Sequence, residues 1–147
     1  MATPYAESGP PSGAPGGKTS LGLESNVGAM LCYIANFLCC IGVILAIIFL
    51  VTEKENRFVK FHAVQSLYLA AAQIAVGILI GILGLLLRLA LDMADLALLA
   101  FFMILGLRLI LVLIFAVFWI IAGVKAYGGQ WYKLPVIGNF AWNTVNK

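Results

Sequence analysis

Charged residues are scarce in this sequence. Only 10% of the chain is Asp, Glu, Lys or Arg and 63% is hydrophobic, whereas soluble domains have about 25% charged and about 45–50% apolar residues. A chain of 147 residues cannot bury that much apolar surface in a water-soluble core. The composition therefore excludes an ordinary soluble domain and predicts an integral membrane protein. The net charge of +3 is small and spread among loops, so we expect no nucleic-acid partner.

Reactive side chains are almost as rare as charge. The only histidine is His62, and no nucleophile, base and orienting acid are grouped around it. The three cysteines lack the CxxC or Cys/His spacing of a metal site, and neither a P-loop nor a dinucleotide-binding glycine motif is present. We therefore expect no enzyme activity, no metal and no cofactor. We interpret His62 as a polar anchor at the start of a helix.

The N-terminus lacks the basic start and apolar core of a secretory signal. Its first twenty residues contain four prolines and four glycines, a composition typical of disorder. We expect three regions: a disordered tail over residues 1–22 that stays on the mature protein, a helical membrane domain over 23–126, and a C-terminal tail over 127–147.

Three apolar blocks occupy residues 27–51, 63–87 and 96–124. Each supplies the roughly 20 apolar residues that a membrane-spanning helix needs, so the sequence predicts an all-α polytopic protein with three spans. The first block contains Asn36 and Gly42 near its middle. We expect one tilted helix there. The alternative is two short helices folded at Gly42 as a re-entrant hairpin, which gives four helices.

The third block contains an arginine, Arg108. If the span began at Leu96, Arg108 would lie near the bilayer midplane at a cost of about 2.5–3.5 kcal/mol. We expect the span to begin near Met103 and residues 89–102 to form a short interfacial helix. Arg108 then either reaches toward the headgroups or has a buried partner, and Asn36 is the other polar residue expected within the membrane. In the interfacial helix, Asp92 lies four residues after Arg88 and can pair with it.

The positions of the lysines and arginines predict the orientation of the chain. Most of them lie in the loop of residues 52–62 and after the third block, whereas Arg88 lies on the opposite side, as does Arg108 if it reaches toward the headgroups. Because cytoplasmic loops are enriched in Lys and Arg, we expect this loop and the C-terminus in the cytoplasm. The N-terminus is outside if the first block crosses once and inside if it is a hairpin. The bacterial inner membrane is the expected location.

Aromatic and basic residues flank the start of the second block. We expect the rings of Phe58 and Phe61 at the headgroup boundary, where aromatic residues anchor membrane proteins. Arg57 and Lys60 can contact anionic headgroups, at about 1 kcal/mol each. In the C-terminal tail we expect Tyr127, Trp131, Tyr132 and Trp142 to act as a surface anchor or, alternatively, as a docking patch near this charged loop.

A stripe of small and polar residues follows one face of the second block. Its members recur at intervals of three or four and are His62, Ser66, Ala70, Gln73, Gly77, Gly81, Gly84 and Arg88. Gly77 and Gly81 form a GxxxG motif, which lets helices approach closely in lipid. We expect this stripe to pack against the first span, the third span or a second copy of the chain.

Three segments resemble a known family: LESNVGAMLCYI at 23–34, EKENRFVKFHAVQSL at 53–67 and AYGGQWYKLPVIG at 126–138. They are similar to small bacterial membrane proteins grouped with the Tic import component of the chloroplast inner envelope, with a branch similar to the magnetosome protein MamF. The resemblance implies a small helical membrane protein. For the plastid relatives it implies four helices and a part in protein translocation, and for the MamF branch a link to a mineral-containing organelle.

Two functions fit these observations. The first is a non-enzymatic component or scaffold of a membrane complex, which works through helix contacts with other membrane proteins or with itself. The second is a Tic-like subunit of a translocation or channel assembly, in which the polar stripe lines a wet path.

Overall fold

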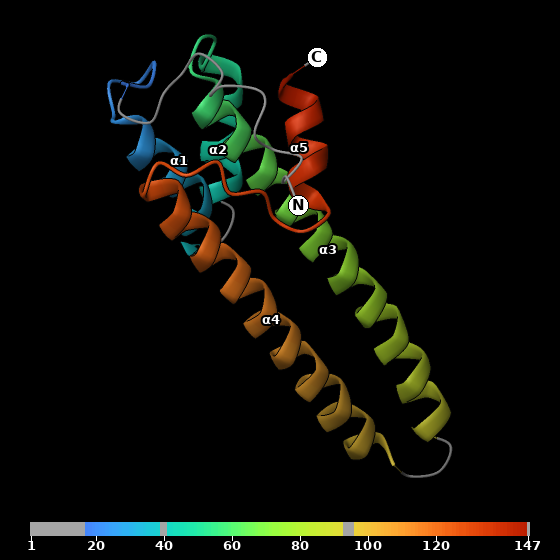
Figure 1. The fold of residues 1–147 in the computed structure, drawn as a ribbon. Coiled ribbons are helices and arrows are strands. Elements are labelled where there is room, and N and C mark those ends of the chain that lie inside the picture. Colours follow the sequence, from blue (N-terminus) through green and yellow to red (C-terminus); the bar gives the residue numbers. More distant parts are fainter. Residues whose placement is uncertain (1–16, 39–40, 93–95, 147) are drawn as a thin grey trace, which may run out of the picture. The chain divides into compact units, whose positions relative to one another are not determined.

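The computed structural model describes residues 17–38, 41–92 and 96–146, and within these ranges the side chains of residues 37, 38 and 92 are not described. The elements, in chain order, are α1 (Ser25–Ile34), the 3-10 turn η1 (Ala35–Leu38), α2 (Ile41–Thr52), α3 (Arg57–Asp92), α4 (Ala97–Tyr127) and α5 (Ile137–Val145). Figure 1 shows these elements. The all-α prediction is confirmed.

The chain divides into two compact units. One contains the residues up to Leu69 and those from Trp119 onward, and the other contains Ala70–Phe118. We call the first the terminal unit and the second the hairpin unit. The terminal unit holds α1, α2, α5, the start of α3 and the end of α4, while the hairpin unit holds the remaining parts of α3 and α4.

The first apolar block is not one helix. It forms α1 and α2, which are separated by η1 and pack against each other. The Asn36 side-chain amide donates a 2.8 Å hydrogen bond to the Cys32 carbonyl near the end of α1. A Cβ atom at Gly42 would lie 2.3 Å from the Asn36 backbone nitrogen, so this reversal needs glycine. The expected single helix is wrong, and the alternative of two short helices is what the structure shows.

Among the described residues, α3 and α4 alone are long and apolar enough to cross a membrane. With 10 and 12 residues, α1 and α2 reach only roughly 15–18 Å, short of the ~30 Å hydrocarbon core. In the hairpin unit, residues 70–92 of α3 and 97–118 of α4 are each roughly 33 Å long, which matches that thickness. The described residues thus contain two candidate spans instead of the three predicted.

The predicted interfacial helix over 89–102 is absent from the described residues. Residues 89–92 complete α3 and residues 97–102 begin α4. Nothing in these leucine-rich stretches interrupts a helix, because neither contains proline or glycine. Arg108 therefore lies well inside α4, roughly 16 Å along the axis from its first residue. Asp95 and the side chain of Asp92 are not among the described parts of the chain, so the pairing of Asp92 with Arg88 stays a prediction.

Residues 17–22, assigned above to a disordered tail, form an ordered turn. The Ser20 backbone N–H donates to Glu53 Oε2 at 2.9 Å, and the Ser25 hydroxyl donates to the Gly17 carbonyl at 2.5 Å. Thr19 is buried. This part of the tail is thus attached to the charged loop, and the rest of the predicted tail lies outside the described residues.

The hairpin unit has its apolar side chains on the outside. Only 6% of the most hydrophobic stretch of α3, and the same share of α4, is buried. The exposed side chains include Ile78, Leu79, Leu83, Leu109 and Leu113. An apolar surface of this extent is stable only against lipid or protein, as expected of a membrane hairpin.

Candidate functional site

A buried hydrogen-bond network surrounds His62 in the terminal unit. His62 Nε2 lies 3.2 Å from the Gln130 carbonyl oxygen and Nδ1 lies 3.0 Å from the Tyr33 hydroxyl. A carbonyl oxygen only accepts hydrogen bonds, so Nε2 carries the proton and Nδ1 accepts from Tyr33. His62 thereby joins α1 to the segment after α4. The side chain is fully buried near the start of α3.

Gln65 completes this network one turn further along α3. Its amide nitrogen donates to the Tyr33 hydroxyl at 2.8 Å and to the Tyr132 carbonyl at 3.1 Å, and its amide oxygen accepts from the Leu134 N–H at 3.2 Å. The side chain is fully buried. Buried polar groups are stable only when they are paired in this way, so the network fastens residues 130–134 onto α3.

An aromatic cluster covers the same turns of α3. Phe58 and Phe61 are 0% exposed, and their ring centroids lie 4.6 and 5.0 Å from that of His62. Trp131 lies 5.2 Å from Phe58, and Trp142 lies 5.8 Å from Phe61. The C-terminal segment thus covers both phenylalanines, and their position at the headgroup boundary stays a prediction. Phe61 also contacts α5, since it forms one apolar cluster with Ala141.

The predicted tail anchors are divided between this cluster and the surface. Trp131, Tyr132 and Trp142 are half-buried, while Tyr127 is exposed. The Lys133 ammonium lies 3.9 Å from the centroid of the Trp142 ring, and partial desolvation lowers the pKa of Lys133 from its ordinary value. Both alternatives for this tail, a surface anchor and a docking patch, stay predictions. Arg57 is exposed and Lys60 half-buried, so both can still reach headgroups.

Two further residues of the charged loop, Glu53 and Asn56, make structural hydrogen bonds. Glu53 is buried and accepts hydrogen bonds from the Ser20 N–H and hydroxyl. Asn56 precedes α3, and its side-chain oxygen accepts from the Val59 N–H at 3.2 Å, as an N-cap residue does. The role of Asn56 can be predicted from the sequence, because an asparagine directly before an apolar-periodic segment indicates a helix start. No local pattern predicts the hydrogen bonds of Glu53.

The predicted stripe changes its environment along α3. His62, Ser66 and Ala70 are buried, Gln73 and Gly77 are exposed, and Gly81 and Gly84 are half-buried. At Gly84 a Cβ atom would lie 3.2 Å from Ile104 Cγ2, whereas at Gly77 it would meet no atom within 4 Å. The helix pair of the hairpin unit therefore packs closely at Gly84 and leaves Gly77 open. Packing of the whole stripe on another helix stays a prediction.

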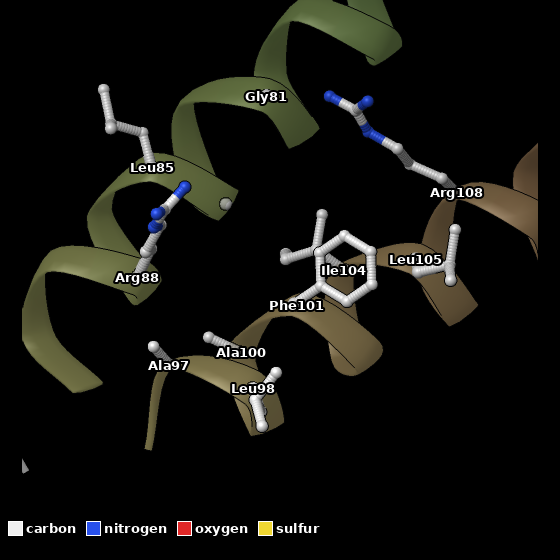
Figure 2. Close-up of a pocket in the computed structure, with 11 residues that line it drawn as sticks. Gly81, Leu85, Arg88, Ala97, Leu98, Ala100, Phe101, Ile104, Leu105 and Arg108 are labelled. Atoms are coloured by element: carbon white, nitrogen blue, oxygen red, sulfur yellow. The ribbon is translucent and has the colours of Figure 1, made fainter. Parts of the chain in front are cut away.

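Two grooves follow this stripe in the hairpin unit. The first, of about 300 Å³, contains Gly77 together with Gln73 and Arg108. The second, of about 480 Å³, contains Gly81, Gly84, Arg88 and Arg108. Arg88 and Arg108 come from opposite helices, and the Arg108 side chain extends toward Gly81 (Figure 2). We take the two grooves as the candidate functional site, because they hold the polar side chains of an otherwise apolar hairpin.

Comparison with known sequences supplies the family. The model of the MamF/MmsF family, described as the magnetosome magnetite crystal formation protein family, matches residues 24–141. The chain belongs to this family. The matched range includes the hairpin unit and every described helix except the last turn of α5. The resemblance to MamF is confirmed, while the resemblance to the Tic import component stays a prediction.

Relatives of this MamF/MmsF family member occur in archaea and are named membrane proteins. A UPF0132 membrane protein of Methanocaldococcus jannaschii is 39% identical over 127 residues, which cover 85% of this chain and 92% of the relative. One from Archaeoglobus fulgidus is 35% identical over 81% of this chain and 93% of its own length. A second M. jannaschii protein is 28% identical over 83% of this chain and 71% of its own length. No solved structure matches the chain.

Proposed function

We propose that this protein is a non-enzymatic membrane scaffold whose hairpin unit associates with the hairpin of a second copy. The observation that carries the proposal is the open position of Gly77. It belongs to a GxxxG motif on a candidate span, yet no atom lies within 4 Å of the place where a side chain would begin. Helices in lipid pack most closely where such small residues meet.

The first groove is mainly apolar. Its walls include Val76, Gly77 and Ile80 of α3 and Leu111 and Phe115 of α4. A symmetric pair of chains would bring the same face of each α3 together, as isologous dimers do. The two glycines would then allow backbone contact, and the walls would supply van der Waals contacts. A helix of a different membrane protein is the competing occupant.

The terminal unit supports this scaffold by joining the start of α3 to the segment after α4. The His62 and Gln65 hydrogen bonds join the start of α3 to residues 130–134 after α4. The loop of residues 52–62 and the C-terminal segment therefore belong to the same unit, which supports our proposal that both lie on one side of the membrane. The excess of Lys and Arg there favours the cytoplasmic side of a bacterial inner membrane.

The family description concerns magnetite crystal formation, and for this chain we propose an assembly role within that setting. The described residues contain no group of three or more His, Cys, Asp or Glu side chains that could hold a metal ion. The proposal therefore assigns these residues to membrane organisation and places no iron site among them. The translocation or channel alternative stays a prediction.

Replacing Gly77 with isoleucine tests the scaffold. The matched control is Gly106→Ile, because Gly106 also has no neighbour within 4 Å and belongs to neither groove. Both variants carry the same helix-propensity change. Crosslinking in native membranes should detect a dimer for the parent and for Gly106→Ile but not for Gly77→Ile. An unchanged dimer in Gly77→Ile would contradict the proposal. Loss of the parent crosslink to a different protein would identify the competing occupant.

A further inference from the structure

The second groove carries two positive charges inside a candidate membrane hairpin. Arg88 on α3 and Arg108 on α4 both contribute to it, and the Arg108 side chain extends toward α3 (Figure 2). The rest of the lining is glycine, alanine, leucine, isoleucine and phenylalanine, with no acidic side chain. Among the residues that the structure describes, no carboxylate pairs with either arginine.

Arg108 is costly at its depth, because it has no carboxylate partner among the described residues. A charged side chain at the centre of a membrane helix costs about 2.5–3.5 kcal/mol on the insertion scale. The guanidinium group offers a planar fork of N–H donors that matches phosphate. Because α4 begins beside the same groove at Ala97, the positive end of its helix dipole adds to the attraction for an anion.

We propose that this groove binds the headgroup region of an anionic phospholipid. Leu98 and Phe101 of the lining are 75% and 60% exposed, so the groove is open along its side to the acyl-chain region. Its apolar walls would contact lipid chains, which a free phosphate ion does not have. Basic pockets between membrane helices recognise anionic lipid headgroups in this way.

The two arginines lie at different depths along the hairpin. Arg88 lies roughly 6 Å from the end of α3, whereas Arg108 lies roughly 16 Å from the start of α4. The phosphate and the ester carbonyls of a phospholipid lie together at the outer end of the molecule. Arg88, which is nearer the end of the hairpin, is therefore the arginine that binds the phosphate. The two helices approach closely at Gly84, where a Cβ atom would lie 3.2 Å from Ile104 Cγ2.

This inference is independent of the scaffold, since Arg88 and Gly84 belong only to the second groove and Gly77 only to the first. Arg108 contributes to both grooves. The decisive variant is therefore Arg88→Gln, which leaves the first groove intact. A dimer that survives in Arg88→Gln while lipid binding falls would separate the two proposals.

The experiment is native mass spectrometry of the full chain, purified in mild detergent and mixed with dioleoyl-phosphatidylglycerol or dioleoyl-phosphatidylcholine. We expect one phosphatidylglycerol per chain, bound about tenfold more tightly than phosphatidylcholine, which corresponds to one charge-assisted contact. Arg88→Gln should remove this preference. Arg108→Gln, which changes the deeper arginine, should reduce the preference less than Arg88→Gln does. The control Lys54→Gln removes an exposed loop charge of the terminal unit and should change nothing.

Three results would overturn the proposal: equal binding of the two lipids by the parent, unchanged preference in Arg88→Gln, or the same loss in Lys54→Gln. Excess inorganic phosphate is the test for a free anion. It should leave the bound lipid in place, and displacement would show that the site recognises phosphate alone. If Arg88→Gln does not fold, Arg88→Lys keeps the charge without the fork and should retain a reduced preference for phosphatidylglycerol.

Discussion

The terminal unit and the hairpin unit place their polar side chains in opposite ways. In the terminal unit, His62, Gln65 and Glu53 are buried and hydrogen-bonded. In the hairpin unit, Gln73 and Arg108 lie on open grooves among exposed leucines and isoleucines. The first unit is stabilised from within, while the second depends on what surrounds it. Equivalent substitutions in the two units should therefore have unequal effects on stability.

The largest difference is expected between the two glutamines of α3. Gln65→Ala should lower the free energy of unfolding by about 3 kcal/mol, because it leaves a cavity and removes the partners of Tyr33, Tyr132 and Leu134. Gln73→Ala, on the exposed face of the hairpin unit, should change it by less than about 1 kcal/mol. Tryptophan fluorescence during denaturant unfolding in detergent measures both, and equal losses would remove the contrast between the units.

A second difference is expected between two glycines. Gly42→Ala should cost about 2–3 kcal/mol, because its Cβ would lie 2.3 Å from the Asn36 backbone and the turn must shift. Gly77→Ala has open space around it and should be neutral or stabilise the helix by up to about 1 kcal/mol. Thermal unfolding of the two variants gives the comparison. A harmless alanine at residue 42 would show that the α1–α2 turn does not need glycine.

The smallest difference in stability is expected between two glutamates of the charged loop. Glu53→Ala should cost about 1–2 kcal/mol, since it removes the acceptor of the Ser20 N–H and leaves the Ser20 hydroxyl only the Thr52 carbonyl. Glu55→Ala, two residues away and exposed, should stay within about 0.5 kcal/mol of the parent. Limited proteolysis near residues 17–22 provides a second readout, because only Glu53→Ala should speed cleavage there. Equal cleavage of both variants would argue against the Ser20–Glu53 attachment.

Composition and periodicity predicted the features that depend on local sequence. The helical class and the long α3 and α4 follow from apolar runs without proline, and both Asn36 and Gly42 were recognised as a place where the first block could fold. The choice between one helix and two depended on contacts that spacing does not show. These are the Asn36 bond to the Cys32 carbonyl and the fit of Gly42 against Asn36.

Long-range contacts account for features that local spacing does not predict. Trp131 and Trp142 cover Phe58 and Phe61 from more than 70 residues away in the sequence. Ser20 lies in a polar, glycine-rich stretch, and its partner Glu53 is 33 residues away. The stripe on α3 could be predicted as one face, but spacing alone did not separate its buried first part from its open part at Gly77.

Disulfide crosslinking through residue 77 shows directly whether the glycine face of α3 joins two copies of the chain. In a background without native cysteines, Gly77→Cys and Leu79→Cys place a thiol on opposite faces of α3, and Leu79 is exposed. After mild oxidation in native membranes, we expect a covalent dimer for Gly77→Cys and mostly monomer for Leu79→Cys. Equal crosslinking at the two positions, or none at residue 77, would contradict the claim that the open glycine face joins two hairpins.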